Sequence, residues 1–244
     1  MTPRYRLDGP PDAPVLVLPS SLGTTTGLWE ANVAHWTGSF RLLRYDQPGS
    51  SSVEELGREL VGLLDGLAIG RASVCGLSLG GATAMWAAVN APGRIDRLVL
   101  ACSSARFGEP APWLERAALV RDQGLEPIAD GVMSRWFTSA ADGGLVARFR
   151  RMLVETARET YAACCEALAF WDFRDRLAEI RVPTLVLGAA HDPATPPEHA
   201  RLLADGIPGA RLVVLQDVAH LANAERPEEF SRLVAAHLAA VEAG

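Results

Sequence analysis

The pentapeptide Gly76-Leu77-Ser78-Leu79-Gly80 is the segment of this sequence best suited to nucleophilic chemistry. It lies between an apolar run that predicts a strand and an amphipathic run that predicts a helix. A serine on such a turn is held in strained backbone with its hydroxyl above the sheet, while the glycines let neighbouring backbone pass without a Cβ clash. This context predicts that Ser78 is a nucleophile rather than an incidental turn residue.

A serine hydroxyl attacks only when a base removes its proton. The sequence contains no lysine, because all 23 basic side chains are arginine, so the base is sought among the five histidines. His220 is the best placed, since it follows the last predicted strand at its carboxyl end, where parallel sheets build their sites. The other histidines fall in helical patterns, apart from His191, which adjoins a carboxylate.

A catalytic histidine needs a carboxylate that holds its tautomer and stabilises the imidazolium. Asp192 follows another predicted strand at its carboxyl end, in a loop stiffened by three prolines. Asp217 is the rival carboxylate, but it lies only three residues from His220 on the same loop and is interpreted as a loop-capping residue. Ser78, Asp192 and His220 are therefore predicted to form a catalytic triad.

The tetrahedral intermediate of acyl transfer carries an oxyanion that needs two amide donors. One donor normally belongs to the residue after the nucleophile, here Leu79, and the other to a loop after an earlier strand. The loop 19–26 is small and polar and follows the predicted strand 15–18, which points to Leu22. The predicted oxyanion hole consists of the backbone N–H groups of Leu22 and Leu79.

The elements that must position these residues alternate along the chain. Strands are predicted at 15–18, 40–45, 72–76, 95–101, 184–188 and 211–215. Their nearly continuous apolar character is typical of strands buried on both faces of a parallel sheet. Helices are expected over 53–67, from Ser78 to about Pro92, over 198–205, and from Pro227 onward, where proline and two glutamates favour a helix start.

Residues 106–181 interrupt this alternation. They contain no convincing strand and show helical patterns at 113–123 and 144–160 that are rich in arginine and aromatic residues. The segment is interpreted as a helical insertion in an α/β domain whose core comprises residues 1–105 and 182–244.

Composition narrows the classes of function. The chain has 244 residues and a net charge of −6, which fits one globular domain and lacks the clustered positive charge of a nucleic-acid surface. No apolar run reaches the length of a membrane helix, so a soluble, cytoplasmic protein without membrane contact is expected. The four cysteines fit neither a disulfide framework nor a zinc site and are expected to be reduced core thiols. A small-molecule substrate is expected, with no metal and no organic cofactor, and the sequence leaves open whether the chain forms a homo-oligomer.

Seven segments carry a resemblance to a known family: YRLDG at 5–9, SSLGTT at 20–25, CGLSLGG at 75–81, RWFT at 135–138, YAACC at 161–165, DPATPP at 192–197 and AHLAN at 219–223. Through them the chain resembles the α/β-hydrolase superfamily over essentially its whole length, and more narrowly the 3-oxoadipate enol-lactonases of the β-ketoadipate pathway. The resemblance implies the α/β-hydrolase fold, with a mostly parallel sheet and a helical cap, residues 106–181, inserted after the sixth strand as a lid. It implies the same nucleophile, acid, base and oxyanion amides that the residues themselves indicate.

The resemblance also implies a substrate, an enol-lactone that bears a free carboxylate. Such a substrate needs a cation in a mostly apolar pocket. Arg135, next to Trp136, is the candidate, because a guanidinium can bind a carboxylate through two parallel hydrogen bonds. Ser21 is the third predicted substrate contact. The turn at 47–52 departs from the Arg-Gly-His-Gly pattern of the family and leads straight to the helix at 53, which predicts a change in one pocket wall.

Two other functions stay open at this point. A carboxylesterase, or a carbon-carbon bond hydrolase of aromatic ring-cleavage products, would use the same triad. A small-molecule receptor on a hydrolase fold would keep the triad and turn over negligibly. Halide-releasing and epoxide-opening enzymes are disfavoured, because they place an aspartate where this chain has Ser78.

Overall fold

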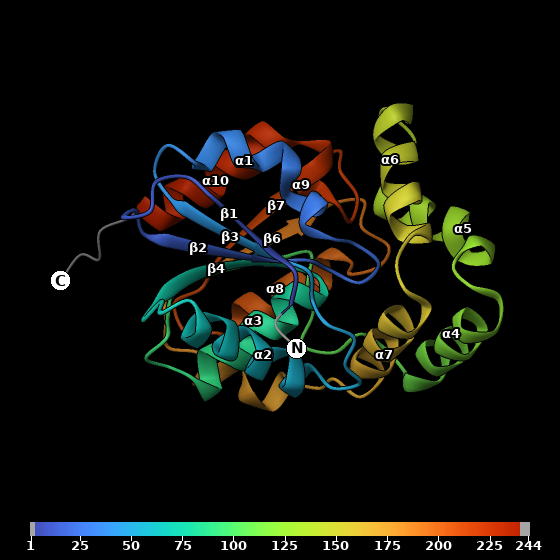
Figure 1. Ribbon diagram of the computed structural model, residues 1–244, viewed down its shortest axis with the longest axis horizontal. Helices are drawn as coiled ribbons and strands as arrows, with labels where there is room; N and C mark the ends of the chain where they lie inside the picture. The colour runs from blue at the N-terminus through green and yellow to red at the C-terminus, as the bar shows by residue number, and fades with distance from the viewer. Residues whose placement is uncertain (1–2, 240–244) are drawn as a thin grey trace.

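A central β-sheet runs through the molecule, with helices on both faces and a further group of helices to one side (Figure 1). The structure is a computed structural model that describes residues 3–239, so the ends of the predicted core, residues 1–2 and 240–244, lie outside it. Within the described residues the sheet has seven strands in the order β1-β3-β2-β4-β5-β6-β7. The strands are β1 (Tyr5–Asp8), β2 (Val15–Pro19), β3 (Arg41–Tyr45), β4 (Ala72–Leu77), β5 (Ile95–Ala101), β6 (Thr184–Ala189) and β7 (Arg211–Leu215). Only the pairing of β1 with β3 is antiparallel among these strands.

The helices form two layers and an insertion. They are α1 (Glu30–Trp36), α2 (Val53–Gly66), α3 (Leu79–Asn90), α4 (Pro110–Gln123), α5 (Glu126–Trp136), α6 (Gly143–Val154), α7 (Arg158–Ala169), α8 (Pro197–Gly206), α9 (Ala222–Glu225) and α10 (Pro227–Ala239), with 3-10 turns η1 (Thr26–Trp29) and η2 (Arg174–Glu179). Helices α1, α9 and α10 lie on one face of the sheet and α2, α3 and α8 on the other, while α4 to α7 stand together beside it (Figure 1).

The alternation of side chains along the strands divides the core between the two faces. In β2, Leu16 and Leu18 belong to the apolar cluster under α1 and α10, whereas Val17 belongs to the cluster under α2 and α3. Because successive residues of a strand point to opposite faces, a strand covered on both sides is apolar at most positions. This is why the buried runs were recognisable as strands, and the six predicted strands are confirmed.

Two elements differ from expectation. Strand β1 was not predicted, because it is an edge strand whose first three residues are exposed and which therefore lacks an apolar pattern. The single helix expected over 144–160 is wrong, since α6 ends at Val154 and α7 begins at Arg158. At the break the Thr156 hydroxyl donates to the Met152 carbonyl at 3.0 Å and the Thr156 N–H donates to the Leu153 carbonyl at 3.0 Å, a local turn that competes with helix continuation.

The number of strands that precede the helical insertion also differs from the expected number. Helices α4 to α7 follow β5, the fifth strand in chain order within the described residues, and not a sixth strand. Among the described residues β1 alone precedes β2, and the turn at residues 9–14 between them adds no further strand. The rest of the predicted arrangement, a mostly parallel sheet with helices on both faces, is confirmed.

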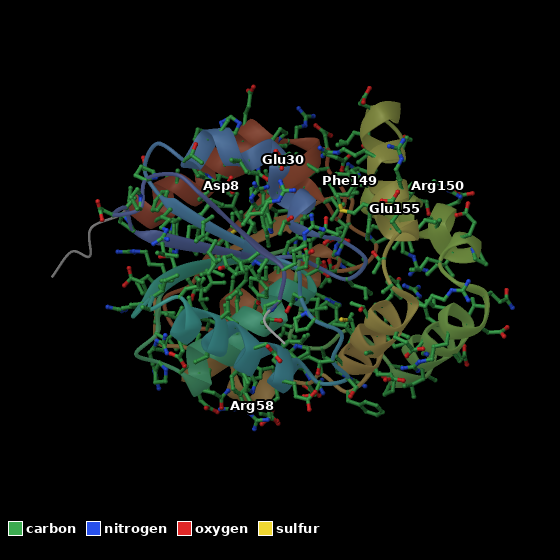
Figure 2. All side chains as sticks on the ribbon, in the orientation of Figure 1. Asp8, Glu30, Arg58, Phe149, Arg150 and Glu155 are labelled. Atoms are coloured by element: carbon green, nitrogen blue, oxygen red, sulfur yellow. The ribbon has the colours of Figure 1, made fainter. Side chains whose placement is uncertain are left out.

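A buried arginine ties the edge strand to the segment that precedes α1. Arg44 on β3 is only 2% exposed, and its guanidinium lies 2.8 Å from the carboxylates of both Asp8 and Glu30, which are labelled in Figure 2. It also donates to the Thr26 carbonyl at 3.3 Å. Because a buried charge is tolerated only when it is paired and hydrogen-bonded, these partners fix β1, β3 and η1 relative to one another.

The structure also bears on the expectations of reduced cysteines and of no membrane-spanning helix. All four cysteines are free and buried, as expected. No helix within the described residues combines the length and the apolar character needed to cross a membrane.

Candidate active site

The turn between β4 and α3 holds Ser78 in an unusual backbone conformation. Its φ is 55° and its ψ is −117°, a region that a residue with a side chain rarely adopts. Two hydrogen bonds to the end of β5 and the loop after it hold this turn. The Ser78 N–H donates to the Ala101 carbonyl at 2.9 Å, and the Ser103 hydroxyl donates to the Ser78 carbonyl at 2.8 Å. The glycines make this possible, since a Cβ at Gly76 would overlap the Gly80 carbonyl. The strain places the serine at the carboxyl end of β4, as predicted.

A single methyl group should test this close approach. We expect Gly76→Ala to lower the free energy of unfolding by about 3 kcal/mol, because the backbone of Gly80 and Gly81 cannot make room for the added carbon. Gly62→Ala is the matched control: it lies on an open face of α2 with nothing within 4 Å and should raise stability by about 0.5–1 kcal/mol. Urea denaturation measures both, and equal midpoints for wild type and Gly76→Ala would contradict the packing argument.

Asp192 and His220 lie in direct contact. His220 Nδ1 is 2.8 Å from Asp192 Oδ2, and the two side chains are almost completely buried. The other carboxylate oxygen, Oδ1, accepts the backbone N–H groups of Ala194 at 2.8 Å and Thr195 at 2.9 Å. The Thr195 hydroxyl adds a bond to Oδ2 at 2.7 Å. The aspartate is thus fixed by its own loop, and Nδ1 of the imidazole must carry the proton, which leaves Nε2 as the free basic nitrogen.

The surroundings of Asp192 keep it ionised. Burial alone would raise its pKa, but the charge of His220 and the hydrogen bonds from His220 and Thr195 outweigh burial and hold the pKa below its usual range. An ionised acid beside the imidazole can stabilise a positive charge that develops there.

The rival carboxylate lies elsewhere. Asp217 occupies a left-handed turn with φ 55° and its side chain is 77% exposed. Its ion-pair contact is a distant one, 4.0 Å from Nε2 of His191, and not with His220. The loop geometry therefore separates the two acids, with Asp192 turned toward His220 and Asp217 toward solvent.

The two amides predicted for the oxyanion hole are both available. Leu79 is the first residue of α3, where a backbone N–H has no carbonyl partner within the helix. In the other loop, the turn is closed by bonds between Ser21 and Thr24, and Gly23 adopts a positive φ of 71°, so the Leu22 amide is not used by the turn. Leu22 itself lines the cavity that Ser78 lines.

The loop that carries Leu22 is braced against the nucleophile helix by Gln47. The Gln47 side-chain amide donates to the Ser20 carbonyl at 3.0 Å, and its backbone N–H donates to the Ser20 hydroxyl at 2.8 Å. The Thr83 hydroxyl on α3 donates to the Gln47 side-chain oxygen at 2.9 Å. These bonds connect the loop that carries Leu22 to α3, the helix that begins with Leu79.

Residues 47–52, the shortened turn, do not line the cavity, and whether the shortening changes a pocket wall relative to the family stays a prediction. The turn packs against α7. The Cys164 thiol lies 3.7 Å from the Pro48 carbonyl, and a Cβ at Gly49 would overlap the backbone of Thr160. The same turn begins with Gln47, which braces the loop at Ser20.

One cavity of about 320 Å³ joins the sheet edge to the helical insertion. The residues predicted from sequence that line it are Ser21, Leu22, Ser78, Arg135, Trp136 and His220. Asp192 lies behind His220, and Leu79 is fully buried at the start of α3. The cavity therefore brings the hydroxyl, the imidazole and an arginine of α5 to one space, with α4 and α7 completing its wall.

The cavity contains a second arginine that sequence reasoning missed. Arg116 of α4 lines the cavity, with its guanidinium carbon 5.1 Å from the centroid of the Trp113 ring. Arg116 and Arg135 line the same cavity, and burial together with the nearby charge of Arg116 lowers the pKa of Arg135. Within the described residues neither arginine forms an ion pair with a carboxylate, and Glu109, which also lines the cavity, is paired with Arg106 at 2.8 Å.

Thr195 was also missed, although a local signal was present. An aspartate followed three residues later by threonine can form a turn in which the carboxylate accepts both the N–H and the hydroxyl of the threonine. Arg116 offered no such signal, because its role depends on how α4 packs. The described residues contain no cluster of three or more metal-ligating side chains.

Comparison with known proteins agrees with this geometry. Residues 15–233 match the model of the alpha/beta hydrolase family. 3-Oxoadipate enol-lactonase 2 of Acinetobacter baylyi is 35% identical over 95% of this chain and 91% of the relative. The crystal structure of the enol-lactonase from Burkholderia xenovorans LB400 is 39% identical, with a TM-score of 0.94 over 97% of this chain and 96% of that chain. A thermophilic esterase from Thermogutta terrifontis is 26% identical, with a TM-score of 0.90 over 96% of this chain and 92% of that chain.

The sheet order, the strained serine turn and the buried acid–imidazole pair define a hydrolase of the α/β type. The chain belongs to the alpha/beta hydrolase family. Within that family it is similar to proteins named as enol-lactonases over nearly its whole length.

Proposed function

We propose that this protein opens the ring of an enol-lactone that carries a free carboxylate, converting 3-oxoadipate enol-lactone to 3-oxoadipate through an acyl-enzyme on Ser78. The observation that carries the proposal is the cavity that Ser78, His220 and two arginines share, and within the described residues neither arginine forms an ion pair with a carboxylate. Similarity to enol-lactonases over 95% or more of the chain supports this substrate over a neutral ester.

In the first half of the proposed reaction, Ser78 Oγ attacks the lactone carbonyl while Nε2 of His220 takes its proton. The amides of Leu22 and Leu79 stabilise the oxyanion, and Asp192 stabilises the imidazolium. Collapse breaks the ring C–O bond, and the proton on Nε2 passes to the departing enol oxygen. The enol then ketonises, which makes ring opening effectively irreversible.

In the second half, water attacks the acyl-enzyme. His220 takes a proton from the water as it adds to the ester carbonyl, and returns that proton to Ser78 Oγ as the ester bond breaks. The product carries two carboxylates, one from the substrate and one from hydrolysis. The helical insertion, residues 106–181, acts as a cap that supplies the arginines and covers the acyl group.

Ultraviolet monitoring of purified enol-lactone with the wild-type protein tests the proposal. Rapid loss of the enol-lactone signal, faster than on aryl esters and vinylogous 1,5-diketones, is the expected result. Preference for aryl esters would indicate a carboxylesterase, and preference for the diketones a carbon-carbon bond hydrolase. Covalent labelling of Ser78 by a fluorophosphonate without steady turnover of any of them would indicate a receptor.

The two arginines should set selectivity for an anion. We expect Arg135→Gln and Arg116→Gln each to raise KM for the enol-lactone about tenfold or more, because each removes a charged hydrogen-bond donor to the carboxylate. Rates on neutral p-nitrophenyl acetate should change less than about threefold. Arg148→Gln is the matched control, since this exposed insertion arginine lies over Phe149 at 5.0 Å and does not line the cavity. Equal losses on the charged and neutral substrates would exclude carboxylate binding by the arginines.

A further inference from the structure

The backbone on both sides of His220 is attached to the end of helix α5. The N–H of Ala219, the residue before His220, donates to Glu225 Oε2 at 2.7 Å. The N–H of Leu221, the residue after it, donates to the Trp136 carbonyl at 3.0 Å. One of these bonds reaches the helical insertion directly, and the other reaches it through Glu225.

Glu225 completes the second connection with its other oxygen. Its Oε1 accepts the Thr138 N–H at 3.0 Å and the Thr138 hydroxyl at 2.7 Å, across 87 residues of sequence. Hydrogen bonds to a carboxylate are roughly twice as strong as bonds between neutral groups. Within the described residues no arginine or histidine forms an ion pair with Glu225. The carboxylate instead accepts three hydrogen bonds, from the Thr138 N–H, the Thr138 hydroxyl and the Ala219 N–H.

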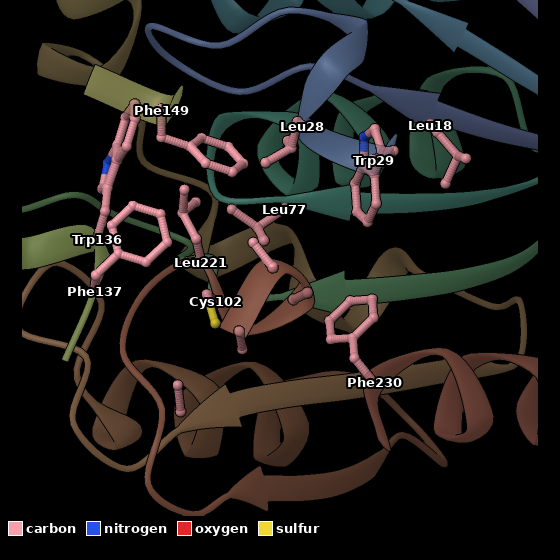
Figure 3. Packing of buried hydrophobic residues seen from close by; sticks show 14 of the residues in the cluster. Leu18, Leu28, Trp29, Leu77, Cys102, Trp136, Phe137, Phe149, Leu221 and Phe230 are labelled. Atoms are coloured by element: carbon pink, nitrogen blue, oxygen red, sulfur yellow. The ribbon is translucent and has the colours of Figure 1, made fainter. Parts of the chain in front are cut away.

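The attached segment is also a wall of the cavity. Arg135 and Trp136 line the space that His220 lines, and Thr138 follows two residues later. Leu221 belongs to the same apolar cluster as Trp136 and Phe137, and these residues gather at the same end of the core (Figure 3). The loop that carries the imidazole and the wall that contacts substrate are therefore joined by both hydrogen bonds and packing.

A further anchor of this loop lies on the side of Asp192. The His191 N–H donates to the Val218 carbonyl at 3.0 Å, which holds the loop to the one that carries Asp192. Asp192 fixes the ring of His220 through Nδ1, but it cannot fix where the backbone at position 220 lies. The anchor at Val218 and the bonds at Ala219 and Leu221 hold the backbone on both sides of that position.

We infer that Glu225 is a positioning residue that fastens the His220 loop to the substrate-contacting end of α5, so that the base and the cavity wall move as one unit. The inference rests on the proposed function, in which His220 is the base for Ser78. The need for such a fastening is physical, because a displacement of about 1 Å at a reacting group can cost about a hundredfold in rate. A shift of residues 136–138 is transmitted to His220 through these bonds.

Glu225→Gln tests the inference with little change of shape. Three donors converge on the carboxylate, so a glutamine must turn its NH₂ group toward at least one of them and repel it. We expect kcat to fall about ten- to a hundredfold on both enol-lactone and p-nitrophenyl acetate, with KM changed less than about threefold. The rate of fluorophosphonate labelling of Ser78 should fall by a similar factor, since that reaction also needs the base.

A pair of variants at Thr138 isolates the connection to α5. Thr138→Val removes only the hydroxyl donor and should lower kcat about fivefold, whereas Thr138→Ser keeps the donor and should restore the wild-type rate to within about twofold. Glu229→Gln is the control, because this exposed glutamate lies on α10 away from the site and should leave the rate unchanged. Thermal melting of each variant shows the fraction that is folded.

Several outcomes would overturn the inference and leave the proposed function standing. One is a Glu225→Gln protein with kcat within twofold of wild type while Ser78→Ala is inactive. Another is equal slowing by Thr138→Val and Thr138→Ser, which would point to packing instead of the hydrogen bond. A melting temperature that falls while the labelling rate per folded molecule is constant would reduce Glu225 to a structural role. If Glu225→Gln does not fold, the two Thr138 variants test the inference. If the wild type does not turn over the enol-lactone, the rate of fluorophosphonate labelling of Ser78 still tests it.

Discussion

Ser78→Ala should lower kcat on the enol-lactone by at least about a thousandfold, because no acyl-enzyme can form and only binding and the oxyanion amides remain to accelerate attack by water. The expectation follows from the geometry, in which the strained turn commits the Ser78 side chain to the cavity that His220 lines. Fluorophosphonate labelling should disappear in the same variant.

The control for this variant lies on the same strand. Ser73 is also a mostly buried serine of β4, but it lies near the opposite end of the strand and does not line the cavity. Ser73→Ala should keep the wild-type kcat. Near-wild-type turnover by Ser78→Ala would exclude the serine mechanism, whichever substrate is used.

Much of the fold was predictable because the relevant signals are local. A strand buried on both faces is apolar at nearly every position, so β2, β4, β5 and β6 could be recognised without knowing their neighbours. The edge strand β1 lacks that signal, since its pairing depends on β3 and on the ion pair between Arg44 and Asp8. The break between α6 and α7 was missed because the helical pattern continues across it while the Thr156 turn does not.

The site shows the same division between local and distant causes. Ser78, Asp192 and His220 were selected because each follows a strand at its carboxyl end, and parallel strands deliver such loops to one edge. The structure brings Asp192 to His220 and places Ser78 and His220 on one cavity, while their catalytic roles stay a prediction.

Arg116 and Glu225 could not be found in this way. Each acts through a partner far along the chain, and no spacing in the sequence reveals which face of α4 meets the cavity or that Glu225 reaches Thr138. Arg135 was selected through a family resemblance, and the structure adds the neighbour that shares its space.

Asp192→Asn should lower kcat about ten-thousandfold, because it inverts the tautomer of His220. Two backbone N–H groups point at Oδ1 and cannot turn away, so the asparagine must keep its oxygen there and direct its NH₂ group at His220. The imidazole then has to accept through Nδ1, which places its proton on Nε2 and leaves no base facing Ser78. Asp217→Asn, which changes the exposed rival carboxylate, is the control and should keep full activity.

The same variant should change how stability depends on pH. The pKa of Asp192 in the folded protein lies below its usual range, so ionised Asp192 contributes stability that is fully present above the unfolded pKa of about 3.9. That contribution is lost as the pH falls through the lower folded pKa. The difference in unfolding free energy between wild type and Asp192→Asn should therefore be constant near neutral pH and shift against the wild type below about pH 4. Urea denaturation from pH 7 to pH 3 measures it, and a difference that stays the same across this range would show that His220 and Thr195 do not stabilise the ionised carboxylate.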